Sequence, residues 1–480
     1  MLACACCLSV GSHFGSHLLG PLKTTLKTSE SEFAALVSAG SLINTLTPLI
    51  SGLLVPKFGP AKVGLVSTGL VLLGHLIVCW RERGNGDIDV GGMVSGLLLA
   101  GAGASPLSVV QESIILRCSD GHSVAKTVAL GLLLGKTASF VSAAVSHPLS
   151  QINSRLPFIT AATLSAFSFS ACFLYYVLER CLVPQTEDED ERLQHLYHTK
   201  GRALRLAELK RFPGRFWIYA LVCCLVGAWD AFTRLSSSLL QTFYAISPSA
   251  AGFAVSAIPF SSIILYPLLG VLIDRHAHAL RRLWYLLPTS MALSCLVLLF
   301  LTDLVPYWLA FVPSALGLGA GPLMTVLVVP LLVERHQAPT ALGAHKSLEQ
   351  AGGIIVQFGT SLLLKGWADK LLAARAVVTF LLGLFLVQLV VVTVWWRVIR
   401  NSRSLRRVDG GVEYTAVVDE EEEEDSGESD GSDLEDEERA VTLDKETRDQ
   451  LRRSKISFYS AATFIATSWV IFAYNMTLKK

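Results

Sequence analysis

The amino-acid sequence predicts an all-α membrane protein made of two groups of six helices. Composition is the first observation, because 52% of the 480 residues are hydrophobic and only 16% are charged, whereas soluble chains carry about a quarter charged residues. The second is that apolar runs of about 20 residues, long enough to cross a bilayer as helix, recur along most of the chain. Because backbone polar groups find no water in hydrocarbon, these runs must be helical.

The predicted helices fall into two sets that a polar segment separates. They are expected at 1–21, 33–55, 63–80, 90–116, 124–147, 156–178, 216–245, 250–273, 283–302, 306–333, 341–364 and 374–396. The first six form an N-terminal bundle, 1–179, and the last six a C-terminal bundle, 216–397. The segment between them, 180–215, has leucines among basic residues, as in a helix lying on a membrane surface.

Basic residues predict the orientation, because cytosolic loops of membrane proteins are enriched in lysine and arginine. One side of the predicted bundle carries Lys57 with Lys62, Arg275 with Arg281 and Arg282, and the run Arg397 to Arg407. The central segment falls on the same side. We therefore expect this side, and the amino terminus, to face the cytosol.

The C-terminal part combines an acidic tail with one more apolar run. Residues 398–455 contain a dense run of acids from Asp419 to Glu438, which repels itself and is expected to be disordered. Ser432, followed by acids, is a candidate phosphorylation site. The run 456–475 is long enough for a thirteenth transmembrane helix, and an interfacial anchor is the alternative.

A short hinge occurs twice, which indicates an internal repeat. "SGLLVPKFGP" follows the second predicted helix of the first bundle, and "LGVLIDRHAH" follows the second helix of the second bundle. Gly52 and Gly270 would allow close helix approach, and Gly59 would permit a tight turn. The second hinge carries the pair Asp274 and Arg275. The first has Pro56 and Lys57 in those places.

The two hinges resemble the loop motif G-x-x-x-D-[RK]-x-G-[RK]-[RK] of the major facilitator superfamily. That resemblance implies two rocking six-helix bundles, with the motif acid acting as a latch on bases and a helix terminus of the neighbouring bundle. Gly270, Asp274 and Arg275 match the motif. In the first half Gly52, Lys57 and Gly59 match, but Pro56 replaces the acid, so we expect a weak first latch.

Three further stretches are similar to the lysosomal dipeptide uniporter branch, that of MFS domain-containing protein 1. They are "LAGAGASPLSVVQESI", "LGLLLGKTASFVSAAV" and a longer stretch containing "ERHQAPTALG". The resemblance implies transport of small peptides across lysosomal membranes with an accessory membrane glycoprotein. It also implies an acid for the substrate amine and a basic residue for its carboxylate. Lys136 occupies the basic position, whereas Ser105 stands where the branch has the acid.

Charged side chains inside predicted helices point to the same region independently. Lys136 lies mid-helix among leucines, where an ammonium group is costly and marks a substrate path or a buried ion pair. Asp230 and Arg234 are one turn apart on one face, so they either satisfy each other or offer charge to a cavity.

Other polar residues complete the candidate set. Glu112 is expected to be a gate or latch acid rather than an amine ligand, and Gln111 and Gln350 are candidates for lining the substrate site. His13 and His17 share a helix face and titrate near neutrality in solution, so they are candidate proton-coupling groups, with plain polar lining as the alternative.

The remaining polar residues are expected to have structural roles. We expect His75 to be a core histidine whose ring nitrogens have hydrogen-bond partners. Lys346 and Glu349 share a helix face and are expected to form an interface pair.

The function expected from these observations is transport of small carboxylate-bearing solutes, above all dipeptides or amino-acid-like substrates, by alternating access. Monocarboxylate transport is one alternative, and a non-transporting membrane sensor or scaffold is another. The expected partners are the substrate, the bilayer and an accessory glycoprotein. We expect no enzyme activity, metal, cofactor or nucleic acid.

The resemblance implies a lysosomal or vacuolar membrane as the location, with the plasma membrane second. The tyrosine-based sorting pattern Tyr414 to Val417 supports an internal membrane.

Overall fold

The computed structural model describes most of the helical part of the chain. The described residues are 1–22, 25–26, 28, 32–33, 36, 43–84, 87–119, 123–182, 209–276, 278–333, 337–401 and 452–471. The predictions for most of the central segment, for the acidic tail with Ser432 and Tyr414 to Val417, and for the start of the second helix lie outside them.

The first part of the chain forms what we call the N-terminal group. Its helices are α1 (Leu2–Cys7), α2 (Val10–Leu22), α4 (Thr47–Phe58), α5 (Pro60–Arg81), α6 (Val90–Arg117), α7 (Val124–Ile152) and α8 (Leu156–Leu182). Two short antiparallel strands, β1 (Glu82–Gly84) and β2 (Asp87–Ile88), connect α5 to α6.

The second part forms the C-terminal group. Its elements are η1 (Leu209–Arg211), α10 (Gly214–Tyr244), α11 (Pro248–Arg275), α12 (Ala279–Phe300), α13 (Tyr307–Ala310), α14 (Val312–Val328), η2 (Val329–Leu331), α15 (Ala338–Lys365) and α16 (Lys370–Asn401). A further helix, which we call the C-terminal helix, covers residues 452–471.

The prediction of an all-α membrane fold is confirmed. Within the described residues, ten helices are long and apolar enough to cross a membrane. Helix α15 is not among the ten, since polar residues such as His345 and Gln350 lower its hydropathy. The C-terminal helix is not among them either, so its crossing of the bilayer stays a prediction.

The structure differs from the predicted elements in several places. The helix expected at 1–21 is divided into α1 and α2. The helix expected at 306–333 is divided into α13 and α14, with Pro313 at the second position of α14. A proline there fits a helix start, because it has no N–H to donate to a preceding turn. The β1–β2 hairpin was not expected; it places the fully buried Glu82 3.0 Å from Arg155 Nε.

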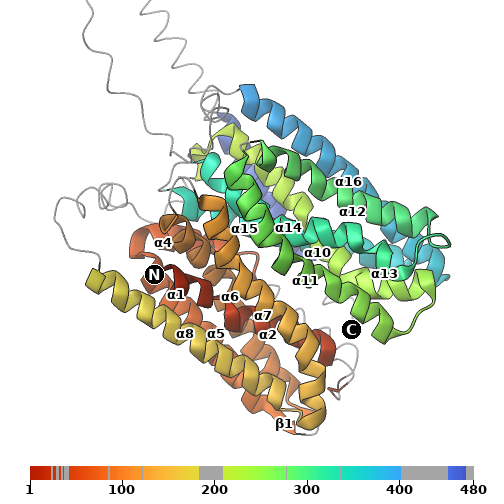
Figure 1. Cartoon of the computed structure of the whole chain (residues 1–480), viewed down its shortest axis with the longest axis horizontal. Coiled ribbons are helices and arrows are strands. Elements are labelled where there is room, and N and C mark those ends of the chain that lie inside the picture. The colour runs from red at the N-terminus through yellow and green to blue at the C-terminus, as the bar shows by residue number, and fades with distance from the viewer. Residues whose placement is uncertain are drawn as a thin grey trace, which may run out of the picture.

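The helices pack within each group and meet along two seams. Figure 1 shows the N-terminal group in red to yellow and the C-terminal group in green to blue, side by side. Within groups, α5 packs on α6 and α8, and α10 packs on α15 and α16. Between groups, α7 packs on α11 and α4 packs on α15. These two seams position the polar residues described below.

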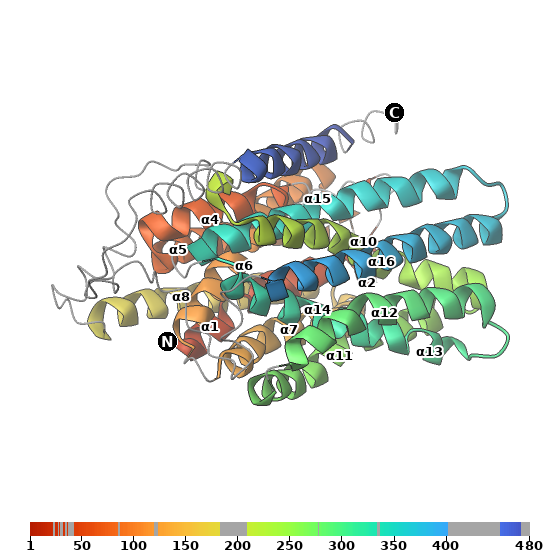
Figure 2. The same ribbon diagram turned by 90° about the horizontal axis from the view of Figure 1, so that it is seen from above.

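The C-terminal helix lies against both groups, as its dark-blue ribbon in Figure 2 shows. Trp217 Nε1 in α10 donates to Ser454 Oγ at 3.0 Å, and Ser454 Oγ donates to the Phe212 carbonyl at 2.9 Å. Farther along, Trp469 Nε1 donates to Thr45 Oγ1, just before α4, at 2.8 Å. The helix therefore bridges the two groups.

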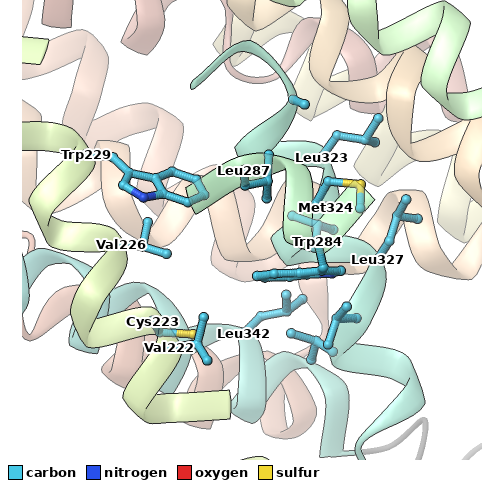
Figure 3. Packing of buried hydrophobic residues seen from close by; sticks show 14 of the residues in the cluster. Val222, Cys223, Val226, Trp229, Trp284, Leu287, Leu323, Met324, Leu327 and Leu342 are labelled. Atoms are coloured by element: carbon cyan, nitrogen blue, oxygen red, sulfur yellow. The ribbon is translucent and has the colours of Figure 1, made fainter. Parts of the chain in front are cut away.

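A hydrophobic core fixes α10, α12, α14 and α15 relative to one another. Trp284 is fully buried between Cys223, Leu327 and Leu342, as Figure 3 shows. Trp229 is also buried, and its indole N–H donates to Gln388 Oε1 at 2.9 Å. Burying a large aromatic side chain with its N–H satisfied is strongly stabilising. The core thus packs α15 against its own group.

Candidate functional site

The seam between α7 and α11 contains the second hinge. Asp274, at the end of α11, accepts hydrogen bonds from the backbone N–H of Ala125 at 2.9 Å and of Lys126 at 3.0 Å. These are free N–H groups in the first turn of α7, so the carboxylate caps a helix of the other group. A Cβ on Gly270 would lie 3.0 Å from Ala129 Cβ, so glycine permits this close approach.

The seam between α4 and α15 repeats this arrangement with a change. A Cβ on Gly52 would lie 2.6 Å from the carbonyl oxygen of Pro339 and 3.0 Å from Thr340 Cα. Pro339 and Thr340 therefore stand to Gly52 as Ala125 and Lys126 stand to Gly270. Thr340 Oγ1 donates to the Gly52 carbonyl at 2.8 Å. Pro56 offers no carboxylate here, and Pro339 has no N–H to give, so both partners of one latch hydrogen bond are missing.

The other hinge residues lie at the surface. Gly59 ends α4 with a φ of +79°, a conformation that favours glycine. Lys57 is exposed, and its ammonium lies 5.2 Å from the centre of the Phe58 ring. Arg275 is exposed too. We call the end of the bundle that carries Lys57, Lys62, Arg275, Arg281 and Arg282 the basic end.

A cluster of buried and partly buried charged groups joins α6 to α15 close to the basic end. Lys346 Nζ lies 3.6 Å from Glu112 Oε1 and 3.7 Å from Glu349 Oε2. Glu112 is only 3% exposed. The Lys346–Glu112 contact joins α6 to α15, and the expected Lys346–Glu349 pair is present. The role of Glu112 as a gate acid stays a prediction.

Sequence reasoning missed two members of this cluster. His345 Nε2 lies 3.2 Å from Glu349 Oε2, and His345 Nδ1 lies 2.9 Å from the Tyr219 hydroxyl. The i, i+4 spacing of His345 and Glu349 is a signal that could have found the first contact. The contact with Tyr219 on α10 has no signal in the sequence.

Contacts between the groups are concentrated at the basic end. Within the described parts of residues 1–182 and 209–401, the hydrogen bonds and ion pairs between the groups are few. They join Leu49 to Ser347, Gly52 to Thr340, Ala125 and Lys126 to Asp274, and Glu112 to Lys346. They lie along α4, in the C-terminal parts of α6 and α11, and in the N-terminal halves of α7 and α15. The two groups are therefore locked together at this end.

A second set of charged side chains is accessible within the spans. Asp230 and Arg234 on α10 keep 44% and 40% of their side chains exposed, with Arg234 Nε 2.9 Å from Asp230 Oδ2. Gln357 Nε2 donates to the same oxygen at 3.2 Å. His17 on α2 is exposed, and the charges that act on it include Lys136, Arg234 and Asp230. Charges from both groups thus converge beside His17.

Lys136 on α7 is half-buried and is one of the charges that act on His17. The charged groups acting on it most strongly are Lys346, Glu349 and Glu112. In the part of the chain that the structure describes, no carboxylate lies within ion-pair distance of its ammonium. Lys136 therefore lies between the accessible charges and the buried cluster without a direct counter-ion among these residues.

The other predicted residues divide into bound and accessible ones. Gln111 is 1% exposed, and its amide donates to the carbonyls of Ala5 and Gly131, both at 3.0 Å, so it links α1, α6 and α7. His13 Nδ1 lies 3.0 Å from Ser139 Oγ. Ser105 and Gln350 are both half-buried. The structure therefore engages Gln111 in packing rather than leaving it free for a substrate.

The histidine of α5 is a core residue, as expected. His75 is 5% exposed, and its Nδ1 lies 2.6 Å from Ser165 Oγ on α8. A buried histidine held in this way fills space within the N-terminal group.

Comparisons with known proteins agree with this architecture. A family model described as Major Facilitator Superfamily matches residues 1–357. A double tryptophan mutant of XylE is similar, with a TM-score of 0.65, 14% identity, and coverage of 85% of this chain and 97% of that chain. The proton:xylose symporter XylE bound to 6-bromo-6-deoxy-D-glucose gives a TM-score of 0.62 at 13% identity, covering 82% and 94%.

A third solved structure is the E. coli fucose:proton symporter FucP, with a TM-score of 0.58, 14% identity, and coverage of 82% and 98%. No curated protein sequence matches the chain. At such low identity these likenesses establish the fold alone. The substrate has to be argued from the residues of this chain.

Proposed function

Because the chain belongs to the Major Facilitator Superfamily of transporters, we propose that it carries small carboxylate-bearing solutes, above all dipeptides, by alternating access. The observation that carries this proposal is Lys136. A half-buried ammonium group in the middle of a membrane helix is expensive unless it meets an opposite charge. A substrate carboxylate supplies that charge at the time of binding.

Asp230 supports a substrate that also bears an amine. Arg234 and Gln357 both contact its Oδ2 atom, which fixes the carboxylate in place. Its other oxygen, Oδ1, has no hydrogen-bond partner among the described residues. An ammonium group of a substrate would find a fixed, accessible acceptor there. Lys136 and Asp230, on opposite groups, would then complement the two ends of a zwitterion. Asp230 would take the place of the acid that is missing at Ser105.

Alternating access supplies the mechanism. The two groups, which we take as the moving units 1–179 and 216–397, are locked at the basic end by Asp274, Thr340 and the Glu112–Lys346 pair. Opening that end requires these contacts to break, and a substrate held between Lys136 and Asp230 would travel with the change.

A monocarboxylate substrate is the second candidate. Ser105 favours it, because the resembling branch would place the amine-binding acid at this position. Such a substrate would need Lys136 but not Asp230. The two candidates therefore differ in one residue, which an experiment can separate.

The membrane location and the accessory partner of the protein are also proposals. Resemblance to the lysosomal dipeptide branch supports a lysosomal or vacuolar membrane and an accessory glycoprotein. A scaffold without transport remains the alternative of another class. Lys136, which has no direct counter-ion among the described residues, speaks against it.

The test is uptake of a labelled neutral dipeptide into liposomes that contain purified protein. Lys136→Ala should abolish uptake, whereas Lys365→Ala, which removes an exposed lysine at the end of α15, should leave it unchanged. Asp230→Asn should reduce uptake of the dipeptide but not of its N-acetylated form. Equal uptake of both forms by every variant would favour the monocarboxylate. No uptake of any carboxylate by folded wild-type protein would overturn the proposal.

A further inference from the structure

His345 is buried and lies in a series of hydrogen-bonding groups beside the lock at the basic end. It is 1% exposed. On one side the Tyr219 hydroxyl lies 2.9 Å from Nδ1, and on the other Glu349 Oε2 lies 3.2 Å from Nε2. The Tyr219 hydroxyl also donates to the Thr325 carbonyl oxygen at 2.8 Å. The chain thus runs Thr325, Tyr219, His345, Glu349.

This hydrogen-bonded series, from Thr325 to Glu349, needs more hydrogens than its neutral side chains carry. Each of the three contacts needs one hydrogen between its two heavy atoms. Tyrosine supplies one O–H, and a neutral imidazole supplies one N–H, since its other nitrogen is only an acceptor. An ionised Glu349 supplies none. One contact would then bring two acceptor atoms together, which is unfavourable.

We propose that the His345–Glu349 pair binds one exchangeable proton while the two groups are locked at the basic end. The proton adds either to the free imidazole nitrogen of His345 or to the carboxylate of Glu349, and it comes from water without any other bond changing. All three contacts are then satisfied. The inference deepens the proposed function, because it assigns a proton site to the moving part of the transporter.

Charged and titratable groups from several helices face the pair. Lys346 on α15, Glu112 on α6 and Lys136 on α7 act on Glu349 or on its neighbours, as do Tyr219 and Cys223 on α10 and Tyr266 on α11. In the core of the cluster, Lys346 supplies one positive charge against the two carboxylates Glu112 and Glu349.

Unlocking would change the affinity for the proton. Separation of α6 from α15 removes Glu112 from Lys346, and water then reaches the cluster. Lys346 is left free to neutralise Glu349, and water can satisfy Tyr219 and His345, so the extra proton is no longer required. A proton that binds better to the locked state stabilises that state, so acidity should favour locking. The proton would thus couple the conformational change to pH.

The experiment measures the conformation directly, without substrate and without transport. Fluorophores are attached through non-natural amino acids at Lys62 and Arg282, two exposed positions of the basic end, one on each group. The distance between them reports the ratio of locked to unlocked protein in detergent. For wild-type protein this ratio should rise at least about threefold from about pH 8 to about pH 5.5.

Two variants separate proton binding from packing. Glu349→Gln supplies an N–H to the imidazole in place of the proton, so it should stay locked at every pH. His345→Gln should lose the dependence on pH. His75→Gln, which changes a buried histidine of the N-terminal group, is the matched control and should behave as wild type.

A wild-type ratio that does not change with pH would overturn the inference, and so would a Glu349→Gln variant that unlocks. Either result would leave the proposed function to its own uptake test, since this readout needs no substrate. If His345 and Glu349 had only a structural role, Glu349→Gln and His345→Gln would both unlock the protein and keep the pH dependence of the wild type.

Discussion

Substitution of Asp274 by alanine should release the lock between α11 and α7. The carboxylate accepts two N–H groups of the first turn of α7, and these contacts exist only while the groups are together. Loss of an N-cap acceptor costs about 0.5–2 kcal/mol, and an anion at a helix N-terminus adds about 0.3–1 kcal/mol. Since these effects overlap and Asp274 is partly accessible, we take about 2 kcal/mol for the difference between locked and unlocked states.

A change of this size is large on the scale of a conformational equilibrium. Because 1.4 kcal/mol corresponds to a factor of ten, Asp274→Ala should lower the locked-to-unlocked ratio by about 30-fold. Fluorophores at Lys62 and Arg282 give the ratio, and Asp303→Ala, which removes an exposed acid at the far end of α12, is the control. A ratio within about twofold of wild type for Asp274→Ala would refute the reasoning.

The first hinge provides the reciprocal test. Pro56→Asp would place a carboxylate at the position in the first hinge that corresponds to Asp274 in the second. Because Pro339 has no N–H, the new carboxylate would find a single backbone donor, the N–H of Thr340. The gain should therefore be about half of the Asp274 effect, or about 1 kcal/mol and fivefold in favour of the locked state. A gain equal to the Asp274 effect would mean that the two seams do not correspond.

Two further predictions concern the α4–α15 seam and the C-terminal helix. Gly343→Ala would place a methyl group against the Pro48 carbonyl oxygen, a backbone atom that cannot move aside. The locked state should therefore lose at least about 1 kcal/mol of stability relative to the unlocked state. An unchanged distance between the fluorophores at Lys62 and Arg282 would contradict this. Trp469→Phe keeps an aromatic ring but removes the hydrogen bond to Thr45 Oγ1, worth about 1 kcal/mol. Hydrogen exchange in residues 452–471 should then rise about fivefold, and unchanged exchange would show that this contact does not hold the helix.

Local sequence patterns were sufficient for the helices and for several candidate residues. Lys136 and Asp230 stand out because a charge in an apolar run is rare whatever surrounds it. Gly52 and Gly270 stand out because the hinge occurs twice. The break before α14 could be read from Pro313, but the apolar run on both sides of it gave the stronger signal.

The partners of these residues could not be found in the same way. Gln111 is a polar residue in an apolar helix, as a binding residue would be. Only the fold shows that its amide donates to the Ala5 and Gly131 carbonyls. The chain from Thr325 through Tyr219 to His345 joins three helices that are far apart in sequence.

The sequence by itself determined a two-part helical membrane protein with a repeated hinge and an unusual lysine, because hydropathy and glycine spacing act over a few helical turns. The tertiary structure alone decided which charges meet. Asp274 finds its donors across 149 residues of chain, and Glu112 finds Lys346 only where α6 and α15 cross. Electrostatic contacts depend on distances of a few ångströms, and those distances are set by how whole helices pack.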